Sequence, residues 1–267
     1  MDEAWPPIDL KGPRSSTDAL LASLWNGSAP YAAFPGFLDE PECLEIITAL
    51  ETAPKTTFRS GDALVSTLGV YLPDAINDPP AYFSRAEELE PFIASVLNHG
   101  RGDVRDRIRL MFESHVNRPV IAAIDPGGQE YGQGSLRIHG SGAGASVHRD
   151  VVSVDAAGWN ISEMEAQFSA VLMLQPSEAG GELVVYRQRW QPEDDGEFKN
   201  KGGKGWDPRV VAGAQVAAYA AAVGDLYIFN PTQYHEVPMT SGESDRVSMQ
   251  FFMAFDPASN GPVVTFS

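Results

Sequence analysis

From residue 119 onward the chain alternates short apolar runs with clusters of turn residues, and this pattern limits the folds open to it. The runs have the length of strands, and Gly, Pro, Ser and Asp stand between them. No repeated helical pattern interrupts the series. The runs lie at residues 120–124, 134–139, 168–175, 182–187, 215–219, 225–229 and 246–255. Many short strands with such punctuation predict a double-stranded β-helix, the cupin-like jelly roll.

Helical patterns come before this region. Thr17 is a suitable N-cap for one helix, and Asp39, followed by Pro41, is suitable for a second. Apolar residues at helical spacing predict two more. The expected helices lie at residues 17–25, 40–50, 89–97 and 104–111. A strand that ends in Phe37-Leu38 and another over 63–72 are also expected, and the helices should support one face of a sheet.

We therefore predict a single domain over residues 1–267, mainly β with flanking helices. The N-terminal arm and supporting helices occupy 1–118, and the jelly-roll core occupies 119–256. A charged, glycine-rich insertion at 187–212 interrupts the core, and a loop of this length in a compact domain is functional or disordered.

The insertion also contains Trp190 and Trp206. Two interpretations of these tryptophans stay open at this point. Their side chains either close over a substrate as part of a lid, or pin the insertion to the barrel.

The composition excludes some partners. The formal net charge is −17, with 36 acidic against 19 basic residues, and phosphate backbones repel such a surface, so no nucleic acid is expected. No apolar run has the length of a membrane span, and the acidic N-terminus lacks the apolar region of a signal peptide. The single cysteine, Cys43, fits a reducing cytoplasm and lies in an apolar helical pattern, where a structural role is expected.

The chemical signal of the chain is His148-Arg149-Asp150. On an extended strand His148 and Asp150 point to the same face and can hold two adjacent positions on a divalent metal. His235, far downstream, is a candidate for a third ligand. Two imidazoles and one carboxylate form the facial triad that leaves positions open on octahedral Fe(II). His99 and His115 have no partner at ligand spacing and are expected to be structural.

The order of these residues resembles the Fe(II)/2-oxoglutarate-dependent oxygenases. Members of that superfamily carry a His-x-Asp, a distal His, and an Arg on the last core strand. The resemblance implies that His148, Asp150 and His235 hold Fe(II). It also implies that Arg246 and Ser248 bind the far carboxylate of 2-oxoglutarate, for which a planar guanidinium is well suited.

The segment Gly180-Gly181-Glu182-Leu183, with its acidic loop downstream, is most similar to small-molecule members. These include amino-acid hydroxylases and the carrier-independent halogenases of alkaloids and free amino acids. Such halogenases replace the carboxylate ligand by Gly to make room for chloride. This chain keeps Asp150, so the resemblance implies hydroxylation of an unactivated C–H bond of a small molecule, with O2 consumed and succinate and CO2 released.

Several alternatives remain open from the sequence. Desaturation or ring closure needs only a different substrate pose, and the oligomeric state is not determined. A non-catalytic jelly-roll binding module needs neither metal nor Arg246, which would then form a surface ion pair. A metal cupin without a cosubstrate usually clusters more His ligands. Arg137 and His139 share a strand face and belong either to the surroundings of the metal or to bulk structure.

Overall fold

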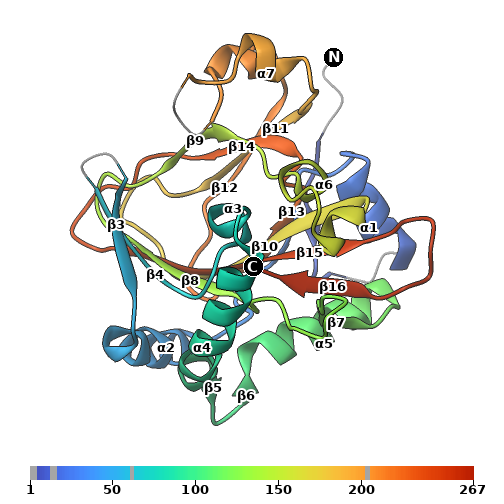
Figure 1. Ribbon diagram of the computed structural model, residues 1–267. Helices are drawn as coiled ribbons and strands as arrows, with labels where there is room; N and C mark the ends of the chain where they lie inside the picture. The colour runs from blue at the N-terminus through green and yellow to red at the C-terminus, as the bar shows by residue number, and fades with distance from the viewer. Residues whose placement is uncertain (1–4, 13–16, 61–62, 202–204) are drawn as a thin grey trace.

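The computed structural model describes residues 5–12, 17–60, 63–201 and 205–267. Most of its strands belong to two sheets (Figure 1). The larger sheet runs in the order β1 (Ile8–Asp9), β2 (Tyr31–Phe34), β13 (Leu226–Phe229), β10 (Ala166–Gln175), β15 (Arg246–Phe255), β8 (Ser135–His139), β4 (Ala63–Leu68) and β3 (Thr56–Ser60), and β16 (Val263–Phe266) pairs with β15 and with β7 (Val120–Ala122). The smaller sheet runs in the order β12 (Val216–Tyr219), β11 (Leu183–Arg189), β14 (Gln233–Val237) and β9 (Ala145–His148).

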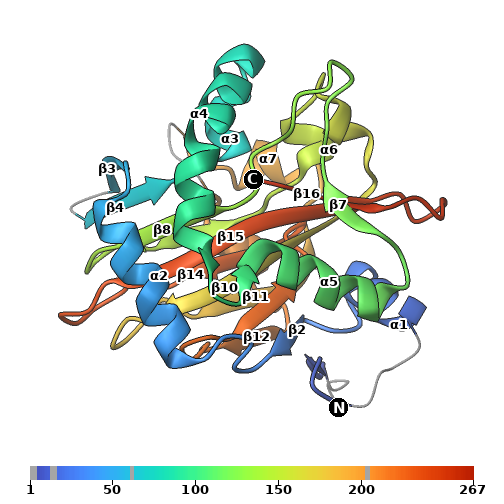
Figure 2. The ribbon, with the colours of Figure 1, turned by 90° about the horizontal axis from the view of Figure 1, so that it is seen from below.

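Helices cover the outer face of the larger sheet (Figure 2). They are α1 (Thr17–Trp25), α2 (Glu40–Thr52), α4 (Pro79–Leu97) and α5 (Val104–Val116), with the hairpin β5 (Asn98–His99) and β6 (Gly102–Asp103) between the last two. Asp39 caps α2 by accepting a hydrogen bond from the backbone N–H of Glu42 at 3.0 Å. Asn117 ends α5 in the left-handed conformation, with φ of 48°.

Strand β15 shows how one sequence pattern serves two environments. Val247, Met249 and Phe251 belong to the apolar core that the sheet shares with the helices. Arg246 and Ser248, which alternate with them, face the opposite side and line a cavity between the two sheets. Burial of the apolar set holds the strand in register, and that register points the polar set into the cavity.

The antiparallel sheets and flanking helices confirm the predicted fold class, but several boundaries were wrong. The strand expected to end in Phe37-Leu38 is β2, which ends at Phe34 because Pro35 and Gly36 turn the chain. The strand expected over 63–72 ends at Leu68, and Leu72 begins a short helix, α3 (Leu72–Ala75). β14 and β16 were not expected, and β2, β3 and β4 extend the sheet from the N-terminal part of the chain.

Two further expectations concern single features. Cys43 is 1% exposed within α2, and burial raises the pKa of its thiol to about 12, which fits a structural role. Among the described residues, no helix combines the length and apolar character needed to cross a membrane.

Candidate active site

Two adjacent strands of the smaller sheet bring His148 and His235 together. Strands β9 and β14 are antiparallel neighbours, and these two residues are direct partners across the pair. Their ring centroids lie 4.1 Å apart. Val147 and Tyr234, one position earlier on each strand, pack instead into an apolar cluster with Trp206 on the other face. The period of two along a strand therefore sends both imidazoles to the inner face.

Asp150 completes the group from just beyond the end of β9. It was expected on the same extended strand as His148, but the strand ends at His148. The backbone N–H of Asp150 donates to the Pro231 carbonyl at 2.9 Å, which fixes the chain at the turn before β14. Its Oδ2 lies 3.7 Å from Nε2 of His235. One ligand atom from each of His148, Asp150 and His235 lies within 4.8 Å of the others.

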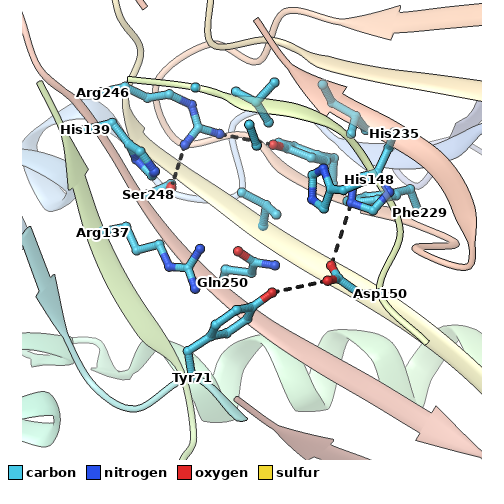
Figure 3. A pocket seen from close by; sticks show the side chains of 16 residues that line it. Tyr71, Arg137, His139, His148, Asp150, Phe229, His235, Arg246, Ser248 and Gln250 are labelled. Carbon is cyan, nitrogen blue, oxygen red and sulfur yellow. Dashed lines mark hydrogen bonds and ion pairs between the residues drawn. The ribbon is translucent and has the colours of Figure 1, made fainter. Parts of the chain in front are cut away.

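Hydrogen bonds orient all three side chains. Nδ1 of His148 donates to the Ser146 carbonyl at 2.8 Å, and Nδ1 of His235 donates to the Gln233 carbonyl at 3.0 Å. Because a carbonyl only accepts, Nδ1 of each ring carries a proton, and Nε2 is the ring nitrogen left to bind a metal. The hydroxyl of Tyr71 donates to Oδ1 of Asp150 at 3.4 Å and leaves Oδ2 toward the imidazoles (Figure 3).

The electrostatics of this group fit a bound dication. Burial, and then the neighbouring His148, hold the pKa of His235 well below its usual range, so its ring is neutral. Burial raises the pKa of Asp150, whose side chain is 14% exposed, and outweighs the opposing effect of nearby positive groups that include Arg137 and Arg149. Two imidazoles and a carboxylate are the donor set suited to Fe(II), which would offset that desolvation.

Arg246 lies at another end of the same cavity and is 4% exposed. Its Nε donates to the Gly181 carbonyl at 2.9 Å, and Nη1 donates to Oγ of Ser248 at 2.9 Å. Nη2 donates to the hydroxyl of Tyr227 at 3.4 Å. The guanidinium is thus held in place by side chains and backbone around β11, β13 and β15, and it points into the interior rather than to a surface ion pair.

The cavity measures about 90 Å³, and both sheets contribute to its lining. His139 and Arg137 of β8 line it as well, so neither belongs to bulk structure. Burial, then Arg246 and Arg137, lower the pKa of His139 to about 3, so its ring is neutral. His139 is the direct partner of Arg246 across β8 and β15. Apolar walls are supplied by Val171, Leu183, Phe229 and Val237.

Sequence reasoning missed Tyr71, Tyr227 and Gly181 as parts of this site. Tyr227 lies in an apolar run that indicates only a buried strand. Tyr71 lies within the strand expected over 63–72, and nothing in the spacing of its neighbours marks it as part of a site. The Gly180-Gly181 pair was noted for its resemblance. A Cβ at Gly180 would lie 2.1 Å from the carbonyl oxygen of Met239, and a Cβ at Gly181 would lie 2.7 Å from Oγ of Ser177 and 2.9 Å from Cδ of Arg246. By contrast His99 and His115 lie outside the cavity and bond to backbone carbonyls, as expected.

The insertion packs on the outer face of the smaller sheet, away from the larger one (Figure 1). It contains α7 (Asp194–Glu197) and a short 3-10 helix (Pro208–Val211). The indole N–H groups of Trp190 and Trp206 both donate to Asp195, at 2.7 and 3.2 Å. Residues 187–201 and 205–212 do not line the metal-site cavity. Of the two interpretations, this packing favours tryptophans that pin the insertion.

Comparison with known proteins adds a family. The model described as the carrier-protein-independent halogenase WelO5 matches residues 32–261. Leucinostatins biosynthesis cluster protein S of Purpureocillium lilacinum is 29% identical over 192 residues, covering 68% of this chain and 77% of the relative. The L-gamma-glutamyl-L-propargylglycine hydroxylase of Streptantibioticus cattleyicolor is 25% identical over 248 residues, covering 87% and 86%.

Solved structures share the fold. The N-substituted L-amino acid dioxygenase of Burkholderia ambifaria AMMD aligns with a TM-score of 0.59 at 15% identity, over 93% of this chain and 90% of its own. The epimerase SnoN from nogalamycin biosynthesis aligns with a TM-score of 0.55 at 13% identity, over 90% and 85%. Since the family model spans most of its length, this chain belongs to the WelO5 family of carrier-protein-independent halogenases, within the non-haem iron, 2-oxoglutarate-dependent oxygenases.

Proposed function

We propose that this enzyme is a hydroxylase rather than a halogenase. In this proposal His148, Asp150 and His235 hold Fe(II), while Arg246 and Ser248 bind the far carboxylate of 2-oxoglutarate. The substrate is a small molecule with an unactivated C–H bond: an amino acid, an amino-acid derivative or a specialised metabolite. Bound Fe(II) and 2-oxoglutarate would supply the oxidising power, by coupling reduction of O2 to release of succinate and CO2.

Asp150 is the observation that carries this proposal. Its carboxylate lies beside both imidazoles, where the halogenases that the sequence resembles carry Gly. A carboxylate at this point would occupy one coordination position on the metal and adds a negative charge. Both effects oppose the binding of chloride, because the position is filled and like charges repel at short range.

The remaining residues bind, orient and exclude water. Tyr71 holds the second oxygen of Asp150, so the carboxylate presents a single oxygen to the metal position. The contacts of Arg246 with Gly181 and Ser248 fix its guanidinium before any ligand arrives. Phe229 packs edge-on against the ring of His235, with centroids 4.9 Å apart, and keeps that side of the cavity apolar.

The relatives support an amino-acid-like substrate. One is named for hydroxylation of a γ-glutamyl amino acid, and a structural neighbour is named for N-substituted L-amino acids. Desaturation or ring closure remains the second candidate, because either needs only a different substrate pose at the same site. Family membership speaks against the non-catalytic binding module considered above. The single-domain organisation over residues 1–267 stays a prediction.

The experiment that tests the proposal measures succinate released from 2-oxoglutarate by the Fe(II)-loaded enzyme, with and without a panel of amino acids and their derivatives. We expect a slow succinate release without substrate, a faster release with the right panel member, and a product heavier by one oxygen atom. Chloride in the buffer should not enter the product. A chlorinated main product, or no succinate under any condition, would contradict the proposal.

A further inference from the structure

Arg137 lines the metal-site cavity, and none of the described residues accepts a hydrogen bond from its guanidinium. It is half-buried on β8, where its direct partners are Ser248 on β15 and Thr67 on β4. Its side chain stacks on the ring of Tyr71, whose centroid lies 4.1 Å from the guanidinium carbon. That contact uses the face of the guanidinium and leaves its N–H edges free.

Several other arginines in the interior have polar partners, whereas Nη2 of Arg189, which lies outside the metal-site cavity, is buried without one. Arg105 forms ion pairs with Asp103 and Glu90, and Arg149 pairs with Asp155. Arg246 bonds to a carbonyl and a hydroxyl. The N–H donors of Arg137 are not fully buried, so they are open to water or to a ligand that replaces that water. Since Arg137 lines the metal-site cavity, that ligand would lie in the active site.

The charges around the cavity define the kind of ligand. In the proposed complex, the dianion 2-oxoglutarate and the carboxylate of Asp150 are balanced by Fe(II) and Arg246. Arg137 then adds one positive charge beyond this balance, at the border of the cavity. A carboxylate fits a guanidinium bidentately and would neutralise this charge.

Two side chains, Tyr71 and Gln250, lie between Arg137 and the metal ligand Asp150 of the proposed site. The Tyr71 ring that stacks on Arg137 also donates its hydroxyl to Asp150, so one side chain connects the two. Gln250 lies between Arg137 and Asp150 in Figure 3. Its amide nitrogen donates to Oγ of Ser169 at 3.2 Å, which leaves its carbonyl oxygen to accept from a substrate N–H.

Arg137 is also reachable from outside. A second hollow of about 440 Å³ on the surface is lined by Tyr71 and Arg137, by Asp74 of α3 and Arg85 of α4, and by residues of β3 and β4. These two side chains therefore form the partition between that hollow and the metal-site cavity. An anion that enters the hollow meets Arg137 before it meets the metal ligands.

We propose that Arg137 binds a carboxylate of the primary substrate, so that the enzyme acts on acids such as amino acids or N-acyl amino acids whose carboxylate is free. This inference rests on the proposed function, because it assumes that Arg246 serves 2-oxoglutarate. The carboxylate bound at Arg137 anchors the substrate, Gln250 accepts from its nitrogen, and the remainder of the molecule extends past Tyr71 toward the triad.

The test uses the Fe(II)-loaded full chain and a panel of free L-amino acids and N-acyl-L-amino acids, each as the acid and as the primary amide. Succinate release above the substrate-free rate reports productive binding. We expect that at least one acid stimulates the wild type, and that its amide has a KM at least tenfold higher. Arg137→Leu should raise the KM for the acid at least tenfold more than it raises the KM for the cosubstrate. The same variant should no longer prefer the acid to its amide. Arg137→Lys should restore part of this preference.

Arg118→Leu is the matched control, since Arg118 also stacks on an aromatic ring, that of Phe255 at 5.4 Å, but lies outside the cavity. Thermal unfolding of each variant separates misfolding from lost binding. Amides that work as well as acids would overturn the proposal, as would an acid KM unchanged by Arg137→Leu. So would a KM increase confined to the cosubstrate, or no stimulation by any acid while substrate-free succinate release persists. Loss of that release in the wild type would instead contradict the proposed function.

Discussion

Arg246 is oriented before any ligand arrives, because Gly181, Ser248 and Tyr227 hold its guanidinium. We therefore predict that Arg246→Leu weakens 2-oxoglutarate binding by about 2–5 kcal/mol, or at least roughly 30-fold, since a buried carboxylate loses its charged partner. Arg246→Lys should recover part of the affinity but lose the bidentate geometry. The measurement is the dependence of succinate release on the concentration of cosubstrate.

The control for this variant is Arg118→Leu, which removes the same charge outside the cavity. An unchanged affinity for 2-oxoglutarate in Arg246→Leu would remove Arg246 from the cosubstrate site. Arg137 would then be the cation to examine next, because it lines the same cavity.

In the proposed function, Asp150 is the side chain that favours hydroxylation over halogenation. Asp150→Gly removes one metal ligand and its negative charge together, and leaves the two imidazoles as ligands. We expect it to lose most hydroxylation and to give at best traces of chlorinated product in chloride, because binding a halide also needs surrounding donors that one substitution does not supply. Mass spectrometry of the product distinguishes these outcomes. Undiminished hydroxylation without an added carboxylate would mean that Asp150 is not a ligand.

The sequence singled out His148, Asp150 and His235 because few side chains bind Fe(II) and their order along the chain is distinctive. The structure brings the three side chains together, and their role as iron ligands stays a prediction. Tyr71 and Tyr227 were not singled out, since a tyrosine that ends or interrupts an apolar run has the same pattern whether it packs or donates. The position of Asp150 beyond β9 also escaped prediction, because the end of a strand depends on backbone partners such as Pro231.

At the scale of elements, the turn between β10 and β11 shapes the end of the cavity at which Arg246 lies. Gly181 has φ of +79°, and a Cβ added there would lie 2.9 Å from Cδ of Arg246. We predict that Gly181→Ala destabilises the fold by more than the roughly 1–2 kcal/mol of left-handed strain and raises the KM for the cosubstrate. Denaturant unfolding and succinate release measure the two effects.

Gly213→Ala is the matched control, because Gly213 has φ of +81° and nothing within 4 Å of the added carbon. It should show the backbone strain without the change in KM. Equal effects of the two substitutions on the KM for the cosubstrate would show that close packing at Gly181 does not position Arg246.

Helices and strands whose apolar residues recur at regular spacing were predicted better than strands whose place depends on pairing with distant strands. Strand β15 and helix α2 were found because their apolar positions recur, and Asp39 marks where α2 begins. Strand β14 is only Gln233–Val237 and mixes polar with aromatic residues, so its place beside β9 and β11 comes from long-range pairing. Strand β16 lies beyond the expected core for the same reason, since it is held by β15 and β7.

At the scale of the whole molecule, the site lies between two sheets that share an apolar cluster, in which Val171 and Tyr227 of the larger sheet pack with Leu183 of the smaller one. A metal and a cosubstrate that bind both sheets should therefore stabilise the folded chain as a unit. At about 100 times its dissociation constant, each ligand contributes about 2.7 kcal/mol, which makes roughly 5 kcal/mol for the two together. For a chain of this size the melting temperature should rise by roughly 10 °C.

Calorimetry without O2, with Fe(II) and 2-oxoglutarate added, measures this shift. The Arg246→Leu variant should show a smaller increase with the cosubstrate at the same concentration. Equal melting temperatures with and without both ligands in the wild type would indicate that the cavity does not take them up.

The most direct test of the account is equilibrium Fe(II) binding without O2, compared among the wild type, His148→Ala, His235→Ala and His115→Ala. His115 bonds to the Met111 carbonyl and lies outside the cavity, so its variant controls for loss of a histidine. We predict about one Fe(II) per chain for the wild type and His115→Ala, and an affinity lower by more than about 100-fold when either ligand is removed. Wild-type iron affinity in folded His148→Ala or His235→Ala would contradict the assignment of the metal site.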